Sequence, residues 1–161
     1  ANFQPSIPPA AWDCLRWGWG VLGELAKRFG SRKSPHPMIA GIGVDVVATE
    51  RIRRMQEEHG ERFLRRLFTQ LERDYCAAFS DPVPHLAARF AAKEAAYKAL
   101  GGVGPIRWKE METRNDERGK PSLHFHGETL ARASEAGIIR TQLSLAHDAG
   151  VAVAQVVLEG T

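Results

Sequence analysis

The chain has 161 residues, of which 43% are hydrophobic and 25% are charged, as expected for one soluble globular domain. Its formal net charge of +3 and pI of about 9.1 suit an anionic ligand or an acidic protein partner, and are too small to indicate nucleic acid. No apolar run is long enough to cross a bilayer, and Cys14 and Cys76 lack metal-site or redox spacing. We therefore expect free thiols and a cytoplasmic protein.

Residues 1–37 form a segment that we interpret as an extension of a domain spanning residues 38–161. Its large apolar residues recur at steps of three and four and would form one stripe of an amphipathic helix over residues 11–29, namely Trp12, Leu15, Trp19, Leu22, Ala26 and Phe29. We hypothesise that this helix docks on the domain; contact with another protein or a membrane surface, and poor order, are the alternatives. Charged residues interrupt the segment (Asp13, Arg16, Glu24), so we do not expect a secretory signal.

From Met38 the period changes to two, which predicts a strand. We expect its apolar residues to face the core (Ile42, Val44, Val46) and its other residues to lie on the opposite face (Gly41, Gly43, Asp45). A charge in so apolar a strand is unusual unless it is paired, at an edge or bound to a ligand. Asp45 is therefore a candidate ligand-binding residue.

Residues 49–68 are predicted to be a helix with a weak point at Gly60, and the capping-box pattern Thr69–Glu72 predicts a second helix that ends near Phe79. The first helix carries many arginines and glutamates, which is typical of a solvated face. The alternative is a docking patch for an acidic helix, in which arginines pair with carboxylates and Met55 and Phe63 supply apolar contacts.

The alanine-rich stretch Arg89–Leu100 predicts a third helix that stops at Gly101. Phe90, Glu94 and Lys98 lie along one face, and Arg89 and Lys93 form a basic row beside it. Taken alone, Glu94 and Lys98 could be an ordinary exposed ion pair.

The remaining chain predicts a hairpin of strands at 110–114 and 120–126, a helix at 128–136, and strands at 142–146 and 151–158. His124 and His126 are expected to be exposed strand residues rather than metal ligands. The element order β-α-α-α-β-β-α-β-β indicates an α+β fold with a mainly antiparallel sheet packed against helices.

Two carboxylates from different elements, Asp45 and Glu94, suit magnesium, which prefers one or two carboxylates together with water and substrate phosphates. Lys98, one turn beyond Glu94, would neutralise phosphate charge. The Gly119-Lys120-Pro121 turn offers another cation and an accessible backbone. Ser144 and His147, at a strand end, could bind phosphate or relay a proton.

These motifs resemble the holo-acyl-carrier-protein synthase family, the small, trimeric type of 4′-phosphopantetheinyl transferase. The resemblance rests on Gly41-Ile-Gly-Val-Asp45 with Arg51, Arg89-Phe-Ala-Ala-Lys-Glu-Ala-Ala-Tyr-Lys98, Gly119-Lys-Pro121, Leu143-Ser-Leu-Ala-His147 and Ala154-Gln-Val-Val-Leu-Glu159. It covers Met38 to Glu159. Ala146 departs from the pattern, because many members have a second serine there.

The resemblance implies transfer of phosphopantetheine from coenzyme A to a serine of apo acyl carrier protein, with release of adenosine 3′,5′-bisphosphate, a step of fatty acid biosynthesis. It implies Asp45 and Glu94 as magnesium ligands, Lys98 as a phosphate contact, and a coenzyme A pocket between subunits of a homotrimer. That pocket would be lined by Arg89, Lys98, Gly119, Lys120, Pro121, Ser144 and His147. It also implies that the carrier docks on the first long helix, at Arg51, Met55, Arg62, Phe63 and Arg66.

As a mechanism we hypothesise that magnesium polarises the β-phosphate while Glu94 takes the serine proton. A non-catalytic scaffold of the same fold is one alternative function. A nucleic-acid-binding module that uses the arginines of residues 51–66 is another. No role is assigned to Lys93.

Overall fold

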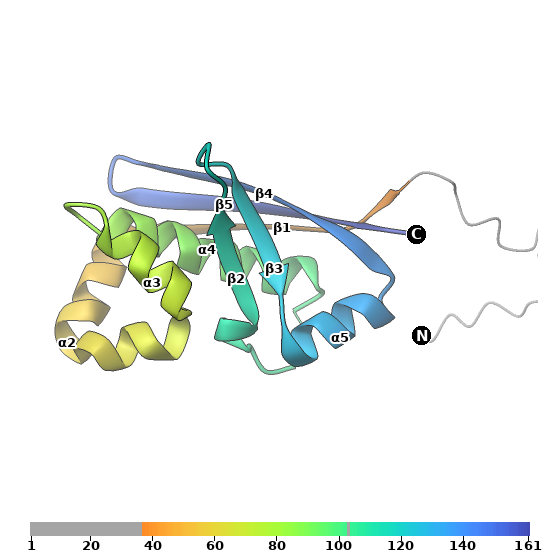
Figure 1. Cartoon of the computed structure of the whole chain (residues 1–161), viewed down its shortest axis with the longest axis horizontal. Helices are drawn as coiled ribbons and strands as arrows, with labels where there is room; N and C mark the ends of the chain where they lie inside the picture. Colours follow the sequence, from red (N-terminus) through yellow and green to blue (C-terminus); the bar gives the residue numbers. More distant parts are fainter. Residues whose placement is uncertain (1–36, 103) are drawn as a thin grey trace, which may run out of the picture. The chain divides into compact units, whose positions relative to one another are not determined.

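The computed structural model describes residues 37–102 and 104–161; the proposed helix 11–29, its docking and Cys14 lie outside this range. The elements follow the predicted order, with one added 3-10 turn, η1 (Figure 1). Their bounds are β1 Met38–Ala48, α2 Thr49–Leu67, α3 Gln70–Ala77, α4 Val83–Ala99, η1 Trp108–Glu110, β2 Met111–Asn115, β3 Pro121–Phe125, α5 Gly127–Glu135, β4 Ile138–Asp148 and β5 Val151–Gly160.

The strands form two antiparallel sheets, which confirms the predicted α+β class. The larger sheet has the order β1-β5-β4, so the C-terminal strand lies between the other two. The smaller sheet is the predicted hairpin β2-β3. It is joined to β4 by a hydrogen bond of 2.7 Å from the Thr141 hydroxyl to the carbonyl oxygen of Leu123.

Helix α4 packs along one face of the larger sheet, against β1, β5 and β4 (Figure 1). The contact is made of small residues, because α4 supplies fully buried alanines and β5 supplies Ala152 and Ala154 beside Val156 and Leu158. Small side chains let the two backbones approach closely. The two backbones come closest at the β1 glycines, where a Cβ added at Gly43 would lie 1.9 Å from the carbonyl oxygen of Ala95.

The prediction for the faces of β1 is wrong. The glycine face of β1 packs against α4, whereas Ile42, Val44 and Val46 are 58%, 54% and 62% exposed. The alternation does correspond to a strand. However, α4 packs so closely on β1 that only glycine fits on the strand face that meets the helix. Within residues 37–102 and 104–161, nothing covers the apolar face of β1.

The helices differ from their predictions mainly at the ends. Helix α2 spans residues 49–67 and is kinked at Gly60, whose backbone angles are not helical (φ 52°, ψ −137°). Gly60 is the position at which the sequence predicts a weak point. The Thr69–Glu72 capping box is present at the start of α3. Helix α4 begins at Val83 rather than Arg89, because proline is tolerated in a first helical turn and the Asp81 side chain accepts a hydrogen bond of 3.1 Å from the Val83 amide.

Strand β4 is longer than predicted, and η1 was not predicted. Within the part of the chain that the structure describes, no helix is both long and apolar enough to cross a membrane. The one described cysteine, Cys76, is a buried free thiol whose pKa burial raises to about 11. A thiol with so high a pKa is unreactive at neutral pH.

Candidate active site

Asp45 lies on the glycine face of β1, where the close approach of α4 brings it next to Lys98. The Lys98 ammonium donates a hydrogen bond of 2.7 Å to Asp45 Oδ1 and another of 3.2 Å to the carbonyl oxygen of Val44. The Asp45 side chain is 16% exposed, whereas Lys98 is 51% exposed. Lys98 therefore lies on the solvent side of this pair, and Asp45 lies on its buried side.

Glu94 lies one turn before Lys98 on α4 and completes the cluster. Burial raises the pKa of the Glu94 carboxyl above its ordinary value, and the Asp45 carboxylate raises it further; the positive charges of Lys98 and Arg51 oppose this. Two carboxylates and two cations thus converge from β1, α2 and α4. The structure brings together Asp45, Glu94 and Lys98 as the sequence predicts, and adds Arg51 to them.

The donor set fits magnesium held by few protein ligands. The Asp45 carboxylate raises the pKa of the Glu94 carboxyl, and a divalent cation between them would relieve that repulsion. Among the described residues no group of three or more His, Cys, Asp or Glu is placed to hold a metal ion. Such a pair leaves the other coordination positions to water and substrate oxygens, which is the usual arrangement for magnesium in phosphoryl-transfer sites.

Arg89 lies in the interior, away from this cluster. Its guanidinium lies 4.1 Å from the centre of the Tyr75 ring and donates a hydrogen bond of 2.6 Å to Asn115 Oδ1. Asn115 in turn donates to the carbonyl oxygen of Gly119 at 3.0 Å. Arg89 therefore supports the turn that carries Gly119, Lys120 and Pro121.

That turn is held by local hydrogen bonds and leaves its cation exposed. Asp116 Oδ1 accepts hydrogen bonds from the amides of Arg118 and Lys120, at 2.9 Å and 2.8 Å. Gly119 has φ 80°, which favours glycine. A firm turn with a free lysine side chain suits an anionic ligand.

Ser144 and His147 lie on β4, separated from Asp45 by the intervening strand β5. The His147 ring meets the His85 ring edge-on, with centroids 5.0 Å apart, and His85 stacks on Phe79 at 3.6 Å. His147 also lines a hollow of about 280 Å³ beside Pro84 and Thr49. His85 and Phe79 are not among the predicted site residues, because only the fold brings them to this strand end.

Four of the five predicted carrier-docking residues line a groove on α2, and Arg51 is not among its lining residues. A groove of about 400 Å³ is lined by Met55, His59, Arg62, Phe63, Arg66 and Leu67. Phe63 is only 7% exposed and packs edge-on against Phe68, so it forms the base of the groove. His59 also lines this groove and is not among the predicted residues. An apolar base flanked by arginines is a surface of the kind that an acidic amphipathic helix would fit.

Comparison with known proteins decides the family. The 4′-phosphopantetheinyl transferase superfamily matches residues 41–154. This chain belongs to that superfamily. The match includes Asp45, Glu94, Lys98 and the Gly119–Pro121 turn, which are the residues assembled above.

Curated relatives in this superfamily are named holo-[acyl-carrier-protein] synthases. The one from Anaeromyxobacter sp. (strain K) is 48% identical over 127 residues, which are 77% of this chain and 98% of the relative. The one from Syntrophotalea carbinolica is 45% identical over 126 residues, with the same two coverages.

Solved structures agree with this. The Neisseria meningitidis holo-[acyl-carrier-protein] synthase has a TM-score of 0.68 at 36% identity and covers 75% of this chain and 98% of its own. The Bacillus anthracis enzyme, described as a complex with CoA (3′,5′-ADP), has a TM-score of 0.63 at 38% identity and covers 77% and 99%.

Proposed function

We propose that this chain is a holo-[acyl-carrier-protein] synthase, which transfers the 4′-phosphopantetheine arm of coenzyme A to a serine of apo acyl carrier protein and releases adenosine 3′,5′-bisphosphate. The observation that carries the proposal is the convergence of Asp45, Glu94 and Lys98 from β1 and α4. The proposal is also supported by the relatives that carry this name, because the match to this chain covers 98% of their length.

Asp45 and Glu94 are the proposed magnesium ligands. When bound, the ion would polarise the pyrophosphate of coenzyme A. Lys98 neutralises charge on the phosphates from the exposed side of the cluster. The serine oxygen attacks the β-phosphorus, the bond to the leaving adenosine 3′,5′-bisphosphate breaks, and the Glu94 carboxylate takes the serine proton.

For coenzyme A we propose the sites predicted from the sequence, on the hairpin turn and at the end of β4. Lys120 is exposed on a turn supported by Arg89 through Asn115, and His147 lies beside a hollow at the strand end. Arg89 is 2% exposed, so we assign it to shaping this site from behind. The proposed acceptor is the acidic carrier of fatty acid biosynthesis, and the proposed location is the cytoplasm.

We also propose that the enzyme is a homotrimer. The face of the larger sheet opposite α4 carries Ile42, Val44 and Val46, which are more than half exposed, next to Val153 and Val157 of β5. An apolar surface of this kind indicates a contact between protein chains. A second copy placed there would cover these side chains and lie beside Ser144, which belongs to the same face through the register Val44–Gln155–Ser144.

The direct test is the mass of an apo carrier protein after incubation with the chain, coenzyme A and magnesium. We expect the carrier to gain one phosphopantetheine, and Asp45→Ala and Glu94→Ala to lose most of this activity together with its dependence on magnesium. An unchanged carrier mass across a panel of carriers would remove the proposed activity. Full activity of either variant would remove the assigned ligands.

A further inference from the structure

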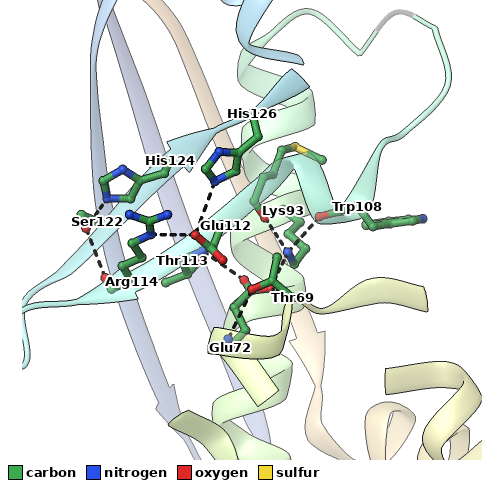
Figure 2. A network of polar contacts seen from close by, with 11 residues as sticks. Thr69, Glu72, Lys93, Trp108, Glu112, Thr113, Arg114, Ser122, His124 and His126 are labelled. Carbon is green, nitrogen blue, oxygen red and sulfur yellow. Dashed lines mark hydrogen bonds and ion pairs between the residues drawn. The ribbon is translucent and has the colours of Figure 1, made fainter. Parts of the chain in front are cut away.

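A fully buried ion pair lies behind the active-site face of α4. Its lysine, Lys93, directly precedes Glu94 in the sequence. Lys93 and Glu72 are both 0% exposed, and the Lys93 ammonium donates a hydrogen bond of 2.8 Å to Glu72 Oε2 (Figure 2). Burying two charges costs free energy, so a pair of this kind is retained only where its geometry and remaining hydrogen bonds are favourable.

The remaining hydrogen bonds of Lys93 go to the backbone of the segment that carries η1. Its ammonium donates to the carbonyl oxygen of Trp108 at 2.8 Å and also to that of Met111 (Figure 2). An ammonium group has three donors, and all three are used. Lys93 thus holds the two ends of η1 against α4.

Glu72 fixes the other side of the same arrangement. Its Oε2 also accepts from the amide of Thr69 at 2.9 Å, and its Oε1 accepts from the amide of Thr113 at 3.0 Å. Helix α3 and strand β2 are therefore tied to α4 through one carboxylate and one ammonium group.

The segment held by Lys93 reaches the active-site face through stacked rings. The Trp108 indole stacks on Phe90, with centroids 5.2 Å apart and an interplanar angle of 21°. The Arg51 guanidinium lies over the same Phe90 ring, 5.5 Å from its centre. Arg51 is exposed on α2, and its charge also acts on Glu94.

We propose that Lys93 is a positioning residue for the carrier protein: by holding the Trp108 and Met111 carbonyls it fixes the Trp108–Phe90 stack on which Arg51 lies. Without this stack Arg51 samples more rotamers, and an acidic partner must order it on binding. Asp45, Glu94 and Lys98 keep their own contacts between β1 and α4. Lys93 therefore acts chiefly on carrier affinity, because a more mobile Arg51 still keeps its positive charge near Glu94.

This inference rests on the proposed function, and its test separates binding from chemistry. The variant is Lys93→Met combined with Glu72→Gln, which leaves no unpaired charge and retains one acceptor oxygen, for the amide of either Thr69 or Thr113. We expect the Kd for an apo carrier, measured without coenzyme A, to rise about two- to fivefold, the size of a lost exposed cation–π contact. The KM for the carrier should rise in parallel, while kcat and the KM for coenzyme A stay within about twofold.

The decisive experiment is a double-mutant cycle, in which the carrier Kd is measured with and without Arg51→Gln in the same background. If Lys93 acts through Arg51, adding Lys93→Met and Glu72→Gln to Arg51→Gln weakens carrier binding no further. Thr113→Val is the matched control, since the buried Thr113 hydroxyl has no hydrogen-bond partner, and it should bind the carrier as the wild type does. Additive losses, or wild-type carrier affinity in the Lys93 variant, would overturn the inference.

A second variant covers the case in which the buried pair cannot be replaced without unfolding. Trp108→Ala removes the stack directly, and its effect on the carrier Kd should also vanish in the Arg51→Gln background; an additive effect overturns the inference. A wild-type chain that bound no acidic carrier would instead bring down the proposed function, and this inference with it.

Discussion

Lys93 is the residue whose sequence context is least informative about its role. It sits between Ala92 and Glu94 in an alanine-rich helix, where a lysine is normally solvated, yet it is fully buried. Burial lowers the pKa of its ammonium group, and Glu72 opposes that effect. Its partner lies 21 residues away on another helix, so helical spacing could not reveal the pair.

Lys93→Met alone should be strongly destabilising. It leaves the Glu72 carboxylate buried without its counter-charge, which costs about 3–5 kcal/mol of the free energy of unfolding. Adding Glu72→Gln should recover most of this loss, because the uncompensated charge is then removed. Denaturant unfolding of the single and double variants measures both values. Equal stability of the single variant and the wild type would show that the pair contributes nothing.

His85 gives the structure a dependence on pH. Burial lowers the pKa of its imidazole, and His147 and Arg89 lower it further, while Asp81 opposes them. The folded state thus binds the His85 proton more weakly than the unfolded state does. The contribution of neutral His85 to the free energy of unfolding is therefore fully present above its unfolded-state pKa of about 6.5. It is lost as the pH falls from there toward the lower pKa of the folded state.

His85→Phe should keep the stacking on Phe79 and remove this part of the pH dependence. We expect the free energy of unfolding to fall less steeply for the variant than for the wild type between about pH 7 and pH 5. Denaturant titrations across that range measure the slopes, with the exposed His59→Gln as the matched control. Parallel slopes for His85→Phe and the wild type would contradict the assignment.

At the scale of elements, β1 and α4 form the unit that builds the active site. Asp45 belongs to the strand, whereas Glu94 and Lys98 belong to the helix, so the site exists only while the two backbones stay close. The sequence was sufficient to predict both elements and to single out the three residues that the fold brings together. It led to the wrong face of β1, since apolar residues were assigned to the core when the core requires glycine there.

Gly43→Ala should damage both the packing and the activity. The added Cβ would lie 1.9 Å from the Ala95 carbonyl oxygen, so β1 and α4 must move apart. We expect a loss of about 1–3 kcal/mol in the free energy of unfolding and a lower kcat as Asp45 leaves Lys98. Unfolding and transfer rates measured on one preparation test this. A variant with unchanged stability and kcat would show that the close approach is not needed.

For the whole molecule, the main unexplained surface is the apolar face of the larger sheet, which no described residue covers. The sequence could not reveal it, because the face of β1 that packs against α4 carries glycines, so the alternation is that of a strand whose apolar side chains face the core. The fold class and the order of elements were predictable, since turns and periodicity are local. The relation of His147 to His85 depends on contacts distant in the sequence, and it was not predictable.

Val44→Glu should prevent the proposed trimer by placing a charge in the middle of that face. We expect a monomer by light scattering at concentrations where the wild type is a trimer, together with a large loss of transfer activity. The matched control is Leu71→Glu on α3, a residue that is 46% exposed and belongs to another surface. An unchanged assembly and activity of Val44→Glu would rule out this face as the interface.

The central claim is that Glu94, beside Asp45 and Lys98, serves a phosphopantetheine transfer to a carrier protein. It is tested most directly by the intact mass of an apo carrier after incubation with coenzyme A and either the wild-type chain or Glu94→Gln. We predict that the wild type adds one phosphopantetheine to the carrier serine and that Glu94→Gln does so about 10²–10⁴ times more slowly. A carrier of unchanged mass with the wild type, or equal rates for the two chains, would contradict the claim.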